Sequence, residues 1–342
     1  MRNHEVSKVQ SLLLPDGSLR EPGWSRRLYQ VYDRKDIKKR KTRIKEWDYY
    51  YVGNSDYGVA LTVADNGYMS MFSISLLDFK RKIAITKSKM GLFPMGKLHM
   101  PSSSEFGDVS VKGKGYDFSF AHVDSMRRLT VRMENFKGKD TFFCDIFLEE
   151  TSPYSLVIAT PFKKKAHFYY NQKINCLKAH GYAEVGKDNY DFNSSSYGVL
   201  DWGRGVWTYR NTWYWCSASG FNNGHLIGWN LGYGFGNTSA ASENMLFIDG
   251  KPYKLGDIRM IIPLNEKDKD DYLKPWRITS EENDLTLSFK PVIDRHADTN
   301  VLLIRSNQHQ VFGYFSGTLR VEGKTIEVKD LPGFAEKVYN KW

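Results

Sequence analysis

Polar and apolar residues along this chain change over at short intervals, as they do in β-strands, and no long amphipathic helix is predicted. Runs rich in valine, isoleucine and aromatic residues are separated by turn signals such as Asp65-Asn66-Gly67 and Asp249-Gly250. Strands this short and this closely spaced are typical of β-sandwiches and barrels. The main expected strands are 46–52, 57–64, 68–77, 109–111, 116–120, 129–133, 141–148, 245–248, 258–262, 276–279, 285–289, 301–304, 311–315 and 325–328.

With 342 residues the chain can form two cores of ordinary size. The strand pattern resets between Pro153 and Pro161, and Lys163 to Lys165 form a polar break. We therefore predict an all-β fold of two tandem lipocalin- or calycin-like antiparallel β-barrels or half-barrels. In this scheme residues 1–45 are a lead-in with a basic segment, residues 46–160 form the first barrel-like domain and residues 161–342 the second.

The stretch from Tyr197 to Gly236 holds five of the nine tryptophans, with glycines spaced between them. Aromatic side chains on a pleated surface offer wide, rigid apolar faces, and glycines let a ligand or another backbone approach closely. A ligand pocket fits this pattern, and so does an ordinary core. If it is a pocket, its expected lining comprises Trp202, Trp207, Tyr209, Trp213, Trp215 and Trp229.

Three residues are candidates for catalysis. Asp201, flanked by a tryptophan, could be desolvated and act as a general acid. Arg204 would hold Asp201 ionised or support it, and the two could equally form a structural ion pair that ties a turn to the barrel wall. His309, between two glutamines and before an apolar strand, could orient a substrate or relay a proton, or could simply be a half-buried structural residue.

Two further acids could face a ligand. Glu243 precedes an apolar run and could point inward at a barrel mouth or close a loop, and Asp294 ends a strand near His296. No metal site is predicted, because the eight histidines are dispersed and no paired-cysteine or His-Glu-x-x-His motif occurs. No phosphate-binding loop or nucleophile elbow occurs either, so we expect no cofactor.

The net charge of +10 arises from two places. Arg34 to Lys45 contributes eight basic residues against one acid, and Lys163 to Lys165 add three. Nucleic-acid binding is not favoured, because the aromatic residues that would stack on bases lie elsewhere in the chain. The segment Arg34 to Lys45 is either a solvated connector, containing a short helix capped by Asp33, or a contact for an anionic surface or ligand.

A cytoplasmic location is expected. No apolar run is long enough to span a bilayer, and Leu12 to Leu14 are too few for the core of a signal peptide. Cys144, Cys176 and Cys216 are odd in number and widely scattered, which favours a reducing compartment over a disulfide framework.

Long motifs of the chain resemble the domain-of-unknown-function 2804 family. They are RIKEWDYYYV, DYGVALTVAD, SISLLDF, YYNQKINC, GVLDWGRGVWTYRNTWYW, SASG, NLGYGFGNTSAASENMLF, SNQHQVFGYFSG and GFAEKVYNKW. More distantly, the arrangement is similar to the twin lipocalin-like barrels of carotenoid hydratase and tocopherol cyclase relatives. Asp201-Trp202-Gly203 lacks the intervening residues of the D-x-x-W-G segment in those relatives, so the resemblance implies the fold and no catalytic residues.

The sequence thus predicts a protein that binds a small apolar or amphipathic molecule in a pocket lined by tryptophan and tyrosine. If it is an enzyme, we expect cofactor-free acid–base chemistry such as hydration, cyclisation or isomerisation, in which tryptophan faces stabilise a developing cation. The alternative is carbohydrate binding or processing, with the aromatic side chains as platforms for sugar rings. A third possibility is a scaffold without a ligand.

Overall fold

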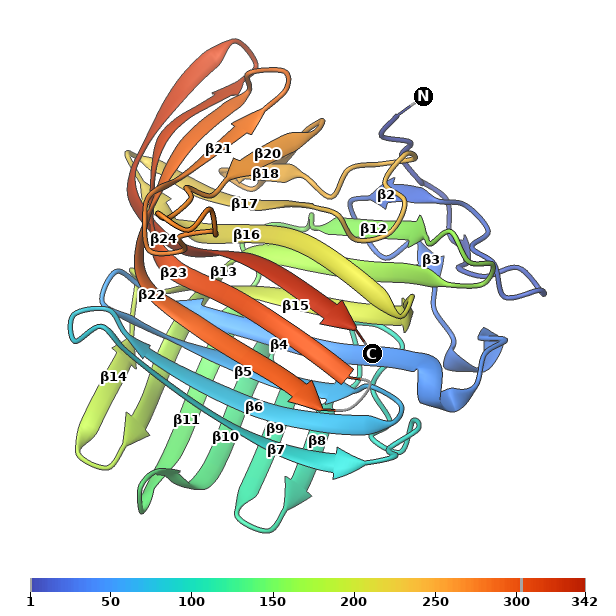
Figure 1. The fold of residues 1–342 in the computed structure, drawn as a ribbon, viewed down its shortest axis with the longest axis horizontal. Coiled ribbons are helices and arrows are strands. Elements are labelled where there is room, and N and C mark those ends of the chain that lie inside the picture. The colour runs from blue at the N-terminus through green and yellow to red at the C-terminus, as the bar shows by residue number, and fades with distance from the viewer. Residues whose placement is uncertain (1, 302–303, 342) are drawn as a thin grey trace.

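The computed structural model describes residues 2–301 and 304–341, and it is built almost entirely from antiparallel strands (Figure 1). Two residues of the predicted strand 301–304 therefore lie outside the described part. The two helical segments are single 3-10 turns, η1 (Arg34–Asp36) and η2 (Lys41–Arg43). Asp33 caps η1 by accepting a hydrogen bond from the Lys35 amide at 2.8 Å, as the sequence predicted.

The first sheet has thirteen strands. Its main path runs, in spatial order, through β7 (Ile83–Leu92), β6 (Met69–Asp78), β5 (Tyr57–Asp65), β4 (Ile44–Gly53), β15 (Tyr197–Val206), β13 (Phe168–Val185), β11 (Asp140–Glu149), β10 (Met126–Lys137), β9 (Tyr116–Val123) and β8 (Val109–Gly113). Both β12 (Leu156–Pro161) and β14 (Asp188–Phe192) pair with β13, and β2 (Gly23–Ser25) pairs with β12. A separate parallel pair joins β1 (Gln10–Ser11) and β3 (Gln30–Val31).

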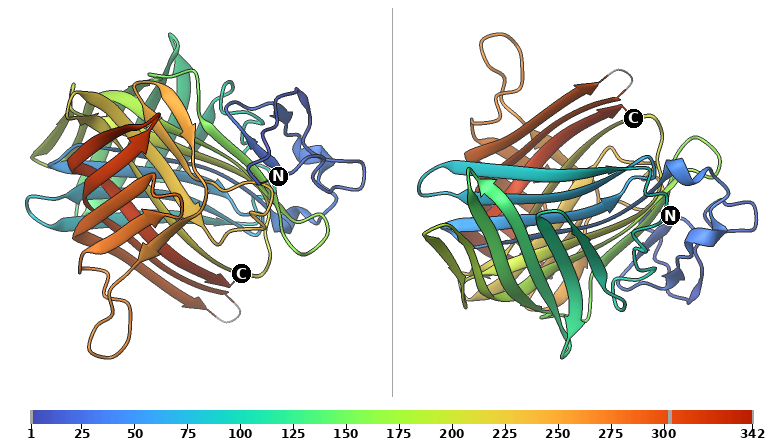
Figure 2. Two further views of the ribbon diagram at one scale, coloured as in Figure 1. Left: turned by 90° about the horizontal axis from the view of Figure 1, so that it is seen from above. Right: turned by 90° about the horizontal axis from the view of Figure 1, so that it is seen from below.

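The second sheet has nine strands. Its order is β19 (Lys251–Lys254), β18 (Met245–Ile248), β17 (His225–Tyr233), β16 (Arg210–Asn222), β24 (Lys324–Lys341), β23 (Ile304–Val321), β22 (Leu285–Val301), β21 (Trp276–Ser280) and β20 (Ile258–Ile261). Each sheet curls on itself, and β13 and β15 of the first lie against β16 and β17 of the second (Figures 1 and 2). The predicted all-β fold of two lipocalin-like half-barrels is confirmed.

The chain passes from one sheet to the other between Val206 and Arg210. The boundary predicted near residue 160 instead lies between β12 and β13, which pair with each other in the first sheet. Lys163 to Lys165 therefore belong to the connection of a hairpin. A run of lysines after a proline indicates a turn. Because turns between paired strands and turns between domains have similar local sequences, the sequence could not distinguish the two here.

Buried side chains form three layers because successive residues of a strand point to opposite faces. One layer lies inside the curl of the first sheet and includes Tyr50 and Trp202; we call it the first-sheet interior. A second lies inside the curl of the other sheet and includes Trp229 and Phe315; we call it the second-sheet interior. The third lies between the sheets, and we call it the inter-sheet layer. It includes Trp47, Tyr49, Tyr51, Val199, Trp207, Trp213, Trp215, Phe312 and Phe334.

Among the described residues, no helix has the length and apolar character needed to cross a membrane.

Candidate functional site

An ion pair lies buried in the inter-sheet layer. On β13, Lys173 shares the face of Tyr169, and its Nζ lies 2.8 Å from Oδ2 of Asp201 on the neighbouring strand β15. The two side chains are only 4% and 11% exposed. Asn171, on the same face of β13, donates a hydrogen bond from Nδ2 to the other oxygen of Asp201 at 2.5 Å. This carboxylate is therefore held by two neighbours from one strand.

The second sheet supplies an aromatic wall for this ion pair. The Nζ of Lys173 lies 3.8 Å from the ring centroid of Trp215 on β16, in cation–π contact. The indole Nε1 of Trp215 donates to Oδ1 of Asn230 at 2.6 Å, and Nδ2 of Asn230 donates to the backbone oxygen of Glu243 at 2.7 Å. The orientation of the tryptophan is thereby fixed, with one face toward a positive charge.

Glu243 brings a second acid to this layer. Its carboxyl lies over Gly232, which faces Trp215 across β16 and β17, and a Cβ at Gly232 would come within 3.2 Å of the Glu243 Cδ. Within residues 2–301 and 304–341, no hydrogen bond reaches this carboxyl, and the residue is 6% exposed. Burial raises the pKa of Glu243 to about 7, with Lys173 lowering and Asp201 raising it. Such a carboxyl can hold and release a proton near neutral pH.

Glu336 on β24 is the third acid of the layer. Its carboxylate accepts hydrogen bonds from Nε1 of Trp213 at 2.8 Å and from Nε2 of Gln310 at 2.9 Å. Tyr49 of the first sheet donates to Oε1 of Gln310 at 3.3 Å and so joins the two sheets. Burial raises the pKa of Glu336 although the Trp213 hydrogen bond opposes it. We call Lys173, Asp201, Glu243 and Glu336 the inter-sheet polar cluster.

A β-bulge in β13 adjoins this cluster. The register with β15 shifts between Ile174 and Leu177, and Cys176 has a φ of 58°. The Cys176 amide donates to the Ser219 hydroxyl at 2.9 Å, which fixes the bulge to the second sheet. Asn175 then donates from Nδ2 to Ser217 Oγ at 2.8 Å and to the Trp229 oxygen at 2.9 Å. Bulges of this kind often re-aim side chains next to active sites.

A small recess with a cavity volume of about 10 Å³, room for about one water molecule, lies at one end of the inter-sheet layer and opens to solvent. Four residues of its lining each lie two positions along a strand, on the same face, from a residue that belongs to the polar cluster or contacts it. The two sets are therefore about 7 Å apart along each strand. These pairs are Val199 and Asp201, Phe334 and Glu336, Tyr51 and Tyr49, and Ser217 and Trp215.

Three buried polar atoms around the cluster and the recess have no hydrogen-bond partner among the described residues. They are Oδ1 of Asn171, Oδ1 of Asn175 and the hydroxyl of Tyr51. The amide nitrogens of both asparagines are engaged, so their oxygens are the groups left over. Buried polar atoms are usually paired, so the free oxygens of the two asparagines beside the cluster leave capacity for a further hydrogen-bond donor.

Five of the predicted site residues meet in the inter-sheet layer: Asp201, Trp207, Trp213, Trp215 and Glu243. Trp207 lies at the aromatic end of the layer, where it packs edge-on against Trp47 at 4.9 Å and Phe235 at 4.8 Å between ring centroids. Trp213 also contacts Phe235, at 5.1 Å. The polar cluster therefore has a tightly packed aromatic region on one side and the recess on the other.

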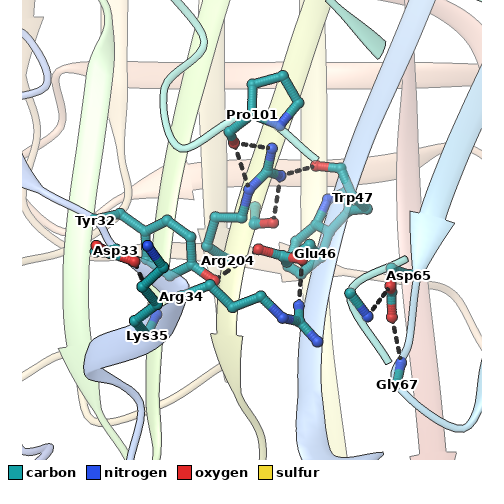
Figure 3. Close-up of polar contacts among 12 residues, drawn as sticks. Tyr32, Asp33, Arg34, Lys35, Glu46, Trp47, Asp65, Gly67, Pro101 and Arg204 are labelled. Carbon is teal, nitrogen blue, oxygen red and sulfur yellow. Dashed lines mark hydrogen bonds and ion pairs between the residues drawn. The ribbon is translucent and has the colours of Figure 1, made fainter. Parts of the chain in front are cut away.

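Arg204 does not pair with Asp201. Residues three apart on a strand point to opposite faces, and Arg204 enters the first-sheet interior. There its guanidinium lies 3.1 Å from Oδ1 of Asp48 and donates to the backbone oxygens of Pro101 and Trp47, both at 2.8 Å (Figure 3). Trp202 faces the same interior, under this guanidinium.

The acid next to Asp48 along this face of β4 is also fully engaged. Glu46 accepts a hydrogen bond from the Tyr32 hydroxyl at 2.7 Å and pairs with Arg34, as Figure 3 shows. The lead-in is thereby attached to the first sheet, and these charges are structural.

His309 is separate from Asp201 as well. It follows the face of Val311, toward the second-sheet interior, and its Nδ1 lies 2.7 Å from Oδ2 of Asp294. Its ring stacks between Tyr272 and His296, with centroids 3.7 Å and 4.0 Å away. Trp229 is buried in the second-sheet interior, and Tyr209 is 40% exposed. The structure thus divides the predicted site among three layers and the surface.

Sequence reasoning missed Asn171, Lys173, Asn175, Glu336 and Tyr49. Part of the signal was present in YYNQKINC, where residues 171, 173 and 175 are polar, although Gln172 between them is polar too and blurs the alternation. Three polar residues at a spacing of two on a buried strand mark one common face. No group of three or more histidine, cysteine, aspartate or glutamate side chains arranged to hold a metal ion occurs within the described ranges.

The structure is similar to two solved structures that differ widely in sequence. A protein provisionally assigned as AttH from Nitrosomonas europaea aligns with a TM-score of 0.54 and 12% identity, over 87% of this chain and 92% of that one. Kievitone hydratase from Nectria haematococca aligns with a TM-score of 0.52 and 11% identity, over 97% and 98% of the two chains. At such identities these likenesses show the shared fold.

A comparison with curated protein sequences finds no match. Residues 3–342 match the family described as "Domain of unknown function (DUF2804)", and the chain belongs to that family.

Proposed function

We propose that this protein binds a small apolar or amphipathic molecule between its two sheets and adds water to it or isomerises it without a cofactor. The observation that carries the proposal is the inter-sheet polar cluster, in which a buried ion pair and two buried acids lie about 7 Å from a small recess that opens to solvent. Charged groups are costly to bury, and arrangements of this kind are concentrated at functional sites. The kievitone hydratase structure, which shares the fold, adds weak support for hydration.

Two carboxyls with different neighbours suit a division of roles. Glu243, with a pKa of about 7, would act as the acid and protonate a double bond of the substrate. Asp201, ion-paired with Lys173, would accept a proton from the attacking water or from the substrate. In hydration the double bond is lost as one C–H bond forms with the proton from Glu243 and one C–O bond forms with water, whose proton passes to Asp201. Before the next turnover this proton must return from Asp201 to Glu243.

A cationic intermediate would have to be stabilised away from Lys173. One face of Trp215 is occupied by the Lys173 ammonium, so a developing positive charge would be stabilised by the Asp201 carboxylate and the ring of Trp213. Trp213 stands beside Trp215 on the same strand face, fixed by Glu336. The role predicted for Arg204 and His309 as supports of Asp201 is taken over in this proposal by Lys173 and Asn171.

The carbohydrate alternative receives less support. Sugar-binding platforms need an exposed flat ring face, whereas Trp207 is buried and packs edge to face against Trp47 and Phe235. Binding to a glycan array that is lost in Trp213→Ala, with no binding of apolar molecules, would reverse this preference.

The first experiment identifies the ligand. Purified protein is denatured and extracted, and the extract is compared by mass spectrometry with that of a Phe334→Trp variant, which fills the recess without removing a charge. We expect an apolar molecule to co-purify with the wild type and to be depleted in the variant. If the wild type carries no such molecule and no terpenoid or phenolic alkene shifts its melting temperature, the binding proposal is wrong.

The second experiment tests the chemistry with the alkene identified above, in heavy-oxygen water. Glu243→Gln should retain binding and lose turnover by at least about 100-fold, the usual contribution of a general acid. Glu281→Gln, at an exposed glutamate, is the matched control and should leave the rate unchanged. Turnover at the wild-type rate in folded Glu243→Gln would exclude Glu243 as the acid.

A further inference from the structure

Two basic stretches far apart in the sequence form one surface. The hairpin connection at Lys163 to Lys165 meets the turn after Pro15, where Lys165 Nζ lies 3.1 Å from Oδ2 of Asp16. The next residue of that turn, Gly17, lies against Lys38, since a Cβ on Gly17 would come within 3.0 Å of the Lys38 Cβ. Figures 1 and 2 show the lead-in and the β12–β13 connection on the same side of the molecule.

A buried histidine, His167, lies beneath this surface, and its burial together with the positive charges of both basic stretches lowers its pKa. His167 is 5% exposed, and its Nδ1 lies 3.0 Å from the Lys165 oxygen. Burial lowers the pKa of His167, and the positive charges of Lys39, Lys164 and Arg43 lower it further. Residues of both basic stretches therefore act on the same point in space.

The cations of this surface fall into two groups. Arg34 pairs with Glu46, and Arg43 donates to the Trp207 oxygen at 3.0 Å, so these two hold the segment against the protein. Most of the others project into solvent, and none of them except Lys165 has an ion-pair partner within the described residues. We call this second group the basic patch: Lys35, Lys38, Lys39, Arg40, Lys41, Lys163, Lys164 and Lys165.

We propose that the basic patch docks this protein onto an anionic lipid bilayer surface. A cluster of lysines and arginines on loops and single helical turns gives a broad positive potential with no fixed geometry, which suits a layer of lipid headgroups. A single-stranded nucleic acid would also need aromatic faces for its bases. Phe162, which directly precedes Lys163, instead packs edge-on against Phe235 at 5.2 Å.

The test is flotation of the full chain with vesicles of phosphatidylcholine, with and without about 30% phosphatidylserine, at 0.1 M salt. We expect binding only to the anionic vesicles, and loss of it at 0.5 M salt. A variant with Lys38→Gln, Lys41→Gln and Lys164→Gln should bind about 100-fold more weakly, since each lysine near an anionic surface contributes about fivefold to partitioning.

The matched control carries Lys114→Gln, Lys139→Gln and Lys187→Gln, three exposed lysines in turns of other hairpins of the first sheet. It has the same net charge as the test variant and should bind like the wild type. Equal weakening in both variants would show that net charge alone drives adsorption and would overturn the proposal. Absence of vesicle binding, with an RNA gel shift that persists at about 0.2 M salt, would also overturn it and assign the patch to nucleic acid.

Discussion

Two buried ion pairs lie three residues apart along strand β15, on opposite faces of the first sheet. In the first-sheet interior, Arg204 pairs with Asp48 and also donates to the backbone oxygens of Pro101, Trp47 and Gly203. In the inter-sheet layer, Lys173 pairs with Asp201 and otherwise faces the ring of Trp215. Both are buried ion pairs between one cation and one aspartate, but the groups that surround the two cations differ.

The difference lies in what remains unsatisfied. Around Arg204 the guanidinium is bonded to four acceptors, which is how a buried charge becomes a structural link. Beside Arg204 the pKa of Asp48 is also raised by burial and Nε1 of Trp202 is unpaired, but the cation itself is fully bonded. Around Lys173 two acids besides its ion-pair partner, Glu243 and Glu336, have raised pKa values, and Asn171 keeps an unpaired oxygen. A buried charge alone therefore does not identify a functional site. Spare hydrogen-bonding and protonation capacity beside the charge does.

The largest effect expected from this comparison is on stability at Arg204. Arg204→Met leaves the Asp48 carboxylate buried without its partner, removes the donor to three backbone oxygens, and should cost about 3–5 kcal/mol of unfolding free energy. Urea denaturation measures this. Arg128→Met, which breaks an ion pair with Asp145 at a side chain 42% exposed, is the control and should cost under about 1 kcal/mol. Similar losses in both would mean that Arg204 is not a structural link.

The second prediction concerns pH and Glu243. The native protein keeps a proton on this carboxyl up to a pH of about 7, whereas the unfolded chain releases it near its ordinary value of 4.5. The unfolded state therefore binds fewer protons between these values, and this group makes stability fall as pH rises from about 4.5 to about 7, by about 3 kcal/mol in all. Glu243→Gln should remove this fall. The measurement is the unfolding free energy of the wild type and of Glu243→Gln, from urea denaturation at several pH values between about 4.5 and about 7. If both free energies change with pH in the same way, the prediction is wrong.

The third prediction separates folding from function at Asp201. Asp201→Asn keeps an oxygen for Lys173 but removes the charge, so we expect a loss of about 2 kcal/mol, the size of a charge-assisted hydrogen bond. The variant should remain folded, with unchanged near-ultraviolet circular dichroism, and should lose the activity proposed here. A folded variant with full turnover would remove Asp201 from the mechanism, and an unfolded one would make the pair with Lys173 as structural as that of Arg204.

The smallest effect is expected at Trp213. Trp213→Phe keeps most of the ring packing and removes the Nε1 donor to Glu336, for a cost of about 1 kcal/mol in urea denaturation. Loss of a donor to the charged form should also raise the pKa of Glu336 further. Trp24→Phe, which removes an indole donor to a backbone oxygen at Asn3, controls for loss of an indole and should not change the titration of Glu336.

The sequence located strands where their signals are local, but it missed β7 and β12 to β14 and predicted β22 and β23 far shorter than their 17 and 18 residues. Alternating apolar residues and turns such as Asp65-Asn66-Gly67 identified β4 to β6, and Asp33 marked the start of η1. The change of sheet was not predicted, because the turn at Lys163 to Lys165 has the same composition whether it joins paired strands or separate sheets. Strand pairing across long stretches of chain is a property of the whole fold.

The sequence by itself determined that this is an all-β protein of two half-barrels and that the excess charge lies in two short stretches. Only the tertiary structure decided which neighbours each charge has. Asp201 meets Lys173 and Arg204 meets Asp48, because the pleat sends residues three apart on one strand to opposite faces and the partners come from other strands. Glu243 and Glu336 join Asp201 because the second sheet packs on the first, and that contact follows from the sum of the apolar surface buried between them.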